Sequence, residues 1–116
     1  MFLANGYPVT ILFDSGASHT FITTACAVRN NLEFDHTKDE YHVKSPGGRI
    51  VTNQLVRDLA PDLEGNIYLA SPLMLHHQGI DVILGVDWMK LYEVVLDTSA
   101  GTVSLTTPDG TGYVTL

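Results

Sequence analysis

Turn-forming residues divide this chain into short segments, and their spacing constrains the fold more than any other feature. Asn5-Gly6 is a strong hairpin signal, because a type I′ turn needs positive φ at both central residues. Further turn signals that contain Gly follow along the chain: Pro46-Gly47-Gly48, Glu64-Gly65-Asn66, Gln78-Gly79, Ala100-Gly101 and Pro108-Asp109-Gly110. The runs between these turns are short and rich in β-branched and aromatic residues, which favours strands.

The pattern therefore predicts an all-β fold, either a sandwich or a barrel-like sheet, with two short helices. The expected helices are Thr20–Asn31, with Asn30-Asn31 as its end, and a short one over Asp87–Tyr92, with Asp87 as N-cap. Mixed charges at 33–35 and 38–40 indicate a solvated loop. The expected strands are Pro8–Phe13, Glu40–Lys44, Ile50–Val56, Asn66–Leu75, Ile80–Leu84, Val94–Asp97, Thr102–Thr106 and Tyr113–Leu116.

Composition limits the functions that are possible. The chain has 116 residues, of which 45% are hydrophobic and 16% charged, so we expect one domain with a buried core. Its net charge of −7 disfavours binding to nucleic acid. We find no apolar run long enough for a membrane span and no secretory signal. The single cysteine, Cys26, excludes an internal disulfide, indicates a reducing compartment and is expected in the core.

The most informative segment is LFDSGASHTF, residues 12–21. An apolar strand runs directly into Asp14-Ser15-Gly16, where a carboxylate is costly to bury unless it is hydrogen-bonded. Gly16 allows a backbone or ligand to approach closely, and Ser15 supplies a hydroxyl that can brace the loop. Taken alone, the tripeptide favours an Asx turn in which Asp14 only closes a bend.

A second segment changes this interpretation. In GIDVILGVDWM, residues 79–89, an apolar strand stops at Gly85 before a short helix. Together the two segments resemble the retropepsin-like aspartic proteases, most closely the protease domain of plant gypsy-type retrotransposon polyproteins. In that family an apolar strand precedes Asp-Thr/Ser-Gly-Ala, and two apolar residues and Gly follow later. The resemblance covers nearly the whole chain, with both motifs in the expected order.

The resemblance implies a single-lobe acid-protease fold, a closed β-barrel, and an aspartic endopeptidase with Asp14, Ser15 and Gly16 as its catalytic residues. Two carboxylates must cooperate, one as base on a water and the other as acid on the peptide carbonyl. The chain has one Asp-Ser-Gly, so the second aspartate must come from another copy in a C2 homodimer. The expected partners are thus a second copy and an extended polypeptide, with no cofactor, no metal and a cytoplasmic location in a polyprotein or virus-like particle.

The same resemblance assigns substrate-binding roles on two sides of the catalytic loop. Glycines in the segment after Lys44 match the flap that closes over the peptide; an ordinary surface hairpin is the alternative. Ile83 and Leu84 match the strand that packs behind the loop and shapes its pockets. The predicted substrate-binding residues are Ala17, Ser18, Ser45, Pro46, Gly47, Gly48, Ile83 and Leu84.

Two departures from the family pattern affect the dimer. Retroviral members usually carry an acidic residue and an arginine where this chain has Ser18 and Val86, so that ion pair is absent. Thirteen residues precede Asp14, whereas the family usually has another strand before the Asn5-Gly6 hairpin, so we expect that strand to be missing.

Other interpretations remain open at this point. The same fold without catalysis could serve as a dimerisation or peptide-binding module. A serine hydrolase is disfavoured, because Thr20 stands where a nucleophile elbow needs Gly. His76 and His77 are adjacent and fit a solvated loop better than a metal site. His19 is expected to be a polar residue at the start of a helix.

Overall fold

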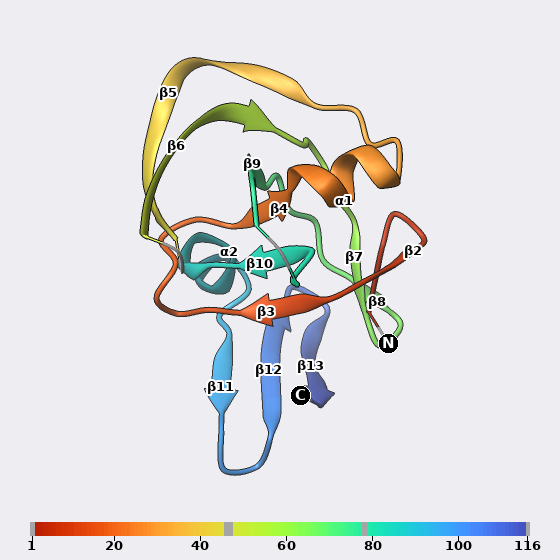
Figure 1. The fold of residues 1–116 in the computed structure, drawn as a ribbon. Helices are drawn as coiled ribbons and strands as arrows, with labels where there is room; N and C mark the ends of the chain where they lie inside the picture. Colours follow the sequence, from red (N-terminus) through yellow and green to blue (C-terminus); the bar gives the residue numbers. More distant parts are fainter. Residues whose placement is uncertain (1, 46–47, 78, 116) are drawn as a thin grey trace.

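The computed structural model describes residues 2–45, 48–77 and 79–115, which form three sheets and two short helices (Figure 1). The four-stranded sheet has the order β2 (Tyr7–Val9), β1 (Phe2–Ala4), β7 (Pro61–Leu63), β8 (Asn66–Ile67). The six-stranded sheet has the order β3 (Ile11–Phe13), β10 (Val82–Leu84), β4 (Phe21–Thr23), β9 (Leu73–Leu75), β6 (Gly48–Leu55), β5 (Asp35–Ser45). The third contains β11 (Val95–Asp97), β12 (Thr102–Thr107) and β13 (Gly110–Thr115).

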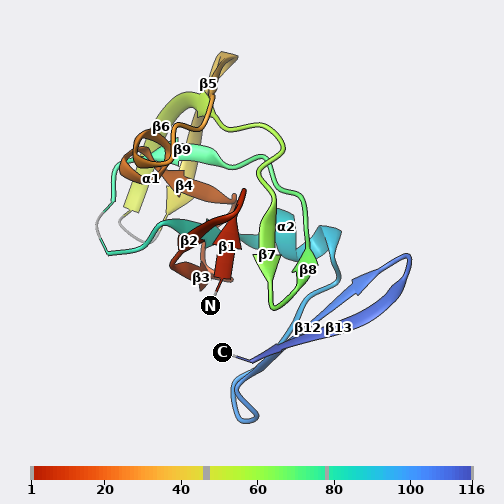
Figure 2. The same cartoon turned by 90° about the vertical axis from the view of Figure 1, so that its right-hand side faces the viewer.

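The all-β class with two short helices is confirmed, but the closed barrel is wrong. The six-stranded sheet ends at β3 on one side and at β5 on the other, and these two edge strands do not pair. Closure of a barrel needs a continuous ladder of paired strands. Most strands here are three residues long, so their ladders are short. Figures 1 and 2 show the consequence: the β5–β6 hairpin arches over one end of the molecule, and β12 and β13 extend from the opposite end.

Strand β10 lies at the centre of the arrangement that positions the first motif. It runs parallel to β3 and antiparallel to β4, so it is inserted between two strands that are consecutive in the chain. The connection between those strands, residues 14–20, therefore passes over the carboxyl end of β10. All three β10 residues are buried because both faces of the strand are covered, with Val82 and Leu84 in one apolar cluster and Ile83 in another.

The helix predicted over residues 20–31 begins later than expected. Its first part is strand β4, which is held between β10 and β9, and α1 covers only Thr24–Arg29. The β-branched residues of this segment suit a buried strand, and pairing on both sides overrides the helical spacing. Thr23 caps the helix by accepting a hydrogen bond from the Cys26 amide at 3.1 Å. The end at Asn30 and the burial of Cys26 are confirmed.

Helix α2 covers Val86–Leu91 and begins one residue earlier than the predicted range, Asp87–Tyr92. Its N-cap is Gly85, which offers no side chain, so the expectation that Asp87 is the N-cap is wrong. Asp87 instead lies in the first turn, where its Oδ1 accepts a hydrogen bond from the Trp88 amide at 2.7 Å. Neither helix of the described residues is long and apolar enough to cross a membrane.

The remaining differences concern strands that lack an apolar alternation. The predicted hairpin is formed by β1 and β2 around Asn5 and Gly6, whose φ angles are 49° and 84°. Strand β7 was not predicted. The charged segment at 35–40, expected as a loop, belongs to β5, where Asp35 and His36 pair with β6 and the register then shifts before Tyr41. The strand predicted over Asn66–Leu75 is interrupted before Pro72, which cannot donate to a ladder.

Candidate active site

Asp14 lies directly after β3, and its backbone is fixed by the neighbouring strand. Its amide donates to the Leu84 carbonyl at 3.0 Å, which extends the β3–β10 pairing by one residue. Its carboxylate Oδ1 accepts the Gly16 amide at 2.8 Å, and its carbonyl accepts the Ala17 amide at 3.1 Å. The Asx turn is therefore present, yet it uses only Oδ1. The half-buried carboxylate keeps Oδ2 without a hydrogen-bond partner among the described residues.

The second motif holds the loop from beneath. The Val86 amide donates to the Ala17 carbonyl at 2.9 Å, and the Gly85 amide donates to Thr20 Oγ1 at 3.1 Å. A Cβ on Gly85 would collide with the His19 carbonyl oxygen and lie 2.9 Å from that of Ala17. Glycine is thus required here by close approach of the backbone, and the two sequence motifs form one structural unit.

Thr20 links this unit to α2, a role that the sequence reasoning missed. Its side chain is buried, accepts from the Gly85 amide and donates to Asp87 Oδ1 at 2.8 Å. Asp87 in turn accepts from the Trp88 amide, so its carboxylate joins the loop to the helix start. A buried threonine one strand before a helix carries no distinctive sequence signal, because its partners are more than 60 residues away.

The other predicted site residues fall into two groups. Ser15 and Ser18 are exposed on the loop, where Ser18 Oγ lies 2.9 Å from His19 Nδ1. Three are buried behind it: Ala17, Ile83 and Leu84. The buried group supports the loop from below, since Ala17 and Ile83 belong to one apolar cluster. Their roles toward a substrate stay predictions.

The predicted flap corresponds to the β5–β6 hairpin, which arches over the side of the molecule that holds the loop after β3 (Figure 1). Ser45 pairs with Gly48, which is exposed and has a φ of 112°, while Pro46 and Gly47 lie outside the described residues. An aromatic contact joins the hairpin to the loop: the His19 ring meets the Tyr41 ring edge-on, with centroids 6.0 Å apart. His19 lies in the loop before strand β4, so the expectation that it starts a helix is wrong.

Asp81, which precedes β10, ties three elements together, and the sequence reasoning gave it no role. It accepts from the Thr10 amide at 2.9 Å and from Arg29 on α1 at 3.1 Å. Burial acts to raise the pKa of Asp81, but these hydrogen bonds and the arginine charge outweigh it, so the pKa lies below its ordinary value. The carboxylate thus fixes the entrance to the strand beneath Asp14.

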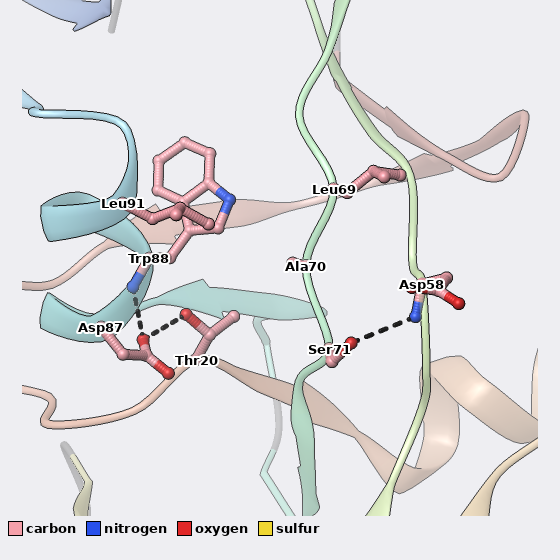
Figure 3. A pocket seen from close by; sticks show the side chains of 8 residues that line it. All are labelled: Thr20, Asp58, Leu69, Ala70, Ser71, Asp87, Trp88 and Leu91. Carbon is pink, nitrogen blue, oxygen red and sulfur yellow. Dashed lines mark hydrogen bonds between the residues drawn. The ribbon is translucent and has the colours of Figure 1, made fainter. Parts of the chain in front are cut away.

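The remaining titratable residues of the described chain form no metal-binding cluster. Within residues 2–45, 48–77 and 79–115, no three His, Cys, Asp or Glu side chains gather as a metal site would require. His76 and His77 lie in the loop after β9. A pocket of about 370 Å³ does lie on the far side of Thr20 and Asp87, between α2 and residues 69–71 (Figure 3). Asp14 is not among its lining residues.

Fold and loop together define a class of protein. A single Asp-Ser-Gly loop braced by a buried apolar-Gly strand is the arrangement of the retropepsin-like aspartic proteases. The family model described as "Retroviral aspartyl protease" matches residues 1–111, so the chain belongs to that family.

Individual relatives narrow the comparison. The chain is similar to "Protein DDI1 homolog 2" of Mus musculus and of Homo sapiens, at 30% identity over 94 residues in each case. These matches cover 80% of this chain and 23% of each relative, so the chain spans about a quarter of the length of the curated relatives it matches. The crystal structure of the retroviral protease-like domain of Ddi1 from Leishmania major has the same fold. Its TM-score is 0.68 at 17% identity, over 97% of this chain and 90% of that one.

These findings confirm the retropepsin-like family and fold that the two motifs indicated. The similarity is to DDI1 protease-like domains, whereas the motifs resembled a plant retrotransposon protease most closely, and that finer origin stays a prediction.

Proposed function

We propose that this chain is an aspartic endopeptidase that acts as a C2 homodimer, with Asp14 of each copy forming the catalytic pair. The observation that carries this proposal is the Asp14 carboxylate. It follows β3, its backbone amide is bonded to the buried strand β10, it is half-buried, and it keeps one oxygen unpaired within the described chain. A residue that served only to close a turn would need neither the Gly85 contact nor the central strand beneath it.

The chemistry requires the second copy. Two carboxylates about 3 Å apart cannot both be ionised, so they share one proton. The ionised oxygen then takes a proton from water while the protonated group donates to the peptide carbonyl. One chain supplies one such aspartate, and a two-fold axis beside Asp14 supplies the other.

An apolar hollow beside Asp14 supports a contact with a second copy. It is lined mainly by apolar side chains of β1, β3 and β11: Phe2, Ile11, Leu12, Phe13 and Leu96. Leu12 is exposed although it lies two residues before the catalytic aspartate. Burial of this surface against another chain would stabilise the dimer and bring the two Asp14 loops together.

The substrate would be an extended polypeptide bound across the dimer beneath the two β5–β6 hairpins, with Ser18 and Gly48 beside it. We propose maturation of a retrotransposon polyprotein in the cytoplasm as the physiological task, which rests on the motif resemblance. The alternative, a non-catalytic dimerisation or peptide-binding module, shares the fold and is decided by experiment.

The direct test is cleavage of an unstructured protein between pH 4 and 8, with wild type and Asp14→Asn in parallel and with a pepstatin-type inhibitor. We expect activity that is inhibited, declines toward alkaline pH, and falls about a thousandfold or more in Asp14→Asn. Activity that survives the substitution would overturn the aspartic mechanism. An inactive wild type that sediments as a dimer would favour the non-catalytic module.

Mixing the two proteins tests the shared site. At a fixed total chain concentration, activity should follow the square of the wild-type fraction, because a mixed dimer contains only one Asp14. A linear dependence would show that each chain acts alone and would contradict the homodimer.

A further inference from the structure

The pocket between α2 and residues 69–71 is bordered by a strand edge on which the Leu69 carbonyl accepts the Tyr92 hydroxyl at 3.2 Å, while two amides remain free within the described chain. Residues 66–70 continue the antiparallel pairing with β7, with the Tyr68 amide bonded to Pro61 and the Ala70 amide bonded to Leu59 at 2.9 Å. Neighbouring amides on an extended segment point to opposite sides, so those of Leu69 and Ser71 point away from β7. Neither has a hydrogen-bond partner among the described residues. This edge can accept another extended chain.

A third unpaired donor lies in the opposite wall. Trp88 on α2 is 3% exposed, and its Nε1 is buried with no hydrogen-bond partner in the described part of the chain. Figure 3 shows this nitrogen on the side of the ring that faces residues 69–71. An unpaired buried donor is costly, and a ligand carbonyl that enters beneath Leu91 would remove the cost.

The rim of the pocket combines aliphatic and acidic groups. Leu69 is 54% exposed and Leu91 is 69% exposed, which is unusual for leucines that flank one hollow. Asp58 and Asp87 lie on opposite sides of the pocket (Figure 3), and neither forms an ion pair with a described residue. The chain as a whole carries a net charge of −7, so its field attracts cations.

We propose that this pocket is a docking groove for an extended segment of a partner protein in which aliphatic residues alternate with lysine or arginine. Carbonyl groups of that segment pair with the free amides of Leu69 and Ser71 as an added strand. Its aliphatic side chains cover Leu69 and Leu91, while its cations lie between Asp58 and Asp87. The groove is separate from the Asp14 loop. The Thr20–Asp87 hydrogen bond lies between them, so a ligand that displaces Asp87 would also affect the loop.

Trp88 is the one tryptophan of the chain, so its fluorescence reports on this groove directly. In an Asp14→Asn background that prevents cleavage, we would titrate a blocked six-residue peptide of alternating Leu and Lys. The comparison peptide has Glu in place of Lys. We expect saturable change in Trp88 emission with the lysine peptide and none with the glutamate peptide. Equal effects of the two peptides, or no effect of either, would overturn the proposal.

Two variants locate the binding. Leu91→Gln should weaken the lysine peptide about tenfold through lost apolar contact, and Asp58→Asn about threefold through a lost exposed ion pair. Asp39→Asn, an exposed acidic residue on β5, is the matched control and should change nothing. Binding that is indifferent to Leu91→Gln and Asp58→Asn, or that a pepstatin-type inhibitor displaces, would place the peptide elsewhere and refute the groove. Because no step requires catalysis, this result is independent of the proposed protease activity.

Discussion

The two sides of the start of α2 are built in opposite ways. On the side of the Asp14 loop, the buried amide and hydroxyl groups of Gly85 and Thr20 are hydrogen-bonded, and glycine replaces a side chain where backbones meet. On the other side, Trp88 Nε1 and two strand-edge amides have no partners among the described residues, and two leucines are exposed.

The difference shows what each side is suited to do. A group that performs chemistry must be held in one position, and a loop whose supporting groups, Gly85 and Thr20, are hydrogen-bonded has little freedom to move. A surface that keeps unsatisfied donors beside apolar groups gains free energy when a ligand covers it. Thr20 and Asp87 form the boundary between the two. We call the side of the Asp14 loop the fixed side, and the side of the pocket around Trp88 and Leu91 the receptive side.

The largest expected effect is on the fixed side. Gly85→Ala places a methyl group against the His19 carbonyl and 2.9 Å from the Ala17 oxygen, and neither backbone group can move without displacing the Asp14 loop. We expect a loss of stability above about 3 kcal/mol in urea denaturation, or failure to fold. Gly16→Ala is the matched control, because its Cβ would lie 3.1 Å from Asp14 Oδ1. That variant should fold and lose activity. Equal stability of the two variants would contradict this account.

Removal of the boundary hydroxyl comes next. Thr20→Val keeps the shape of the side chain but leaves the buried Gly85 amide without an acceptor, which should cost about 2 kcal/mol. Thr20→Ser keeps both hydrogen bonds and loses one methyl group, so it should cost about 1 kcal/mol. Chemical denaturation of both variants tests this order, and a more stable Val variant would show that the hydroxyl contributes little.

Asp81 should make part of the stability pH-dependent. Because its pKa is lowered on folding, its contribution is complete above the ordinary carboxyl pKa of about 4 and is lost as the pH falls through the lower folded value. Asp81→Asn should therefore destabilise by about 1 kcal/mol at pH 7 and by progressively less below pH 4. Denaturation midpoints from pH 2 to 7 measure this, with Asp39→Asn as control. A pH-independent difference would rule out the charge as the cause.

The smallest effect is expected on the receptive side. Leu91→Gln removes a side chain that is 69% exposed and keeps a good helix former, so stability should change by less than about 0.5 kcal/mol. The same substitution is expected to weaken peptide docking. A large loss of stability would mean that Leu91 is part of the packed core, and the contrast between the two sides would fail.

Local patterns predicted the elements whose neighbours in sequence are also their neighbours in space. The Asn5-Gly6 hairpin, the end of α1 at Asn30 and the short apolar strand before Gly85 all follow from a few adjacent residues. Strand β4 and β7 did not, because their pairing partners lie far along the chain, and helical spacing at residues 20–31 was overridden by pairing on both sides.

Residue type and local order were enough to predict the class of fold and the aspartate on its glycine turn. The open sheets, the requirement for glycine at 85 and the support of the loop by Thr20 and Asp81 became visible only in the three-dimensional arrangement. The same holds for the donors around Trp88 that remain unpaired within the described chain. Those properties depend on which distant backbones meet, and spacing along the chain does not encode that.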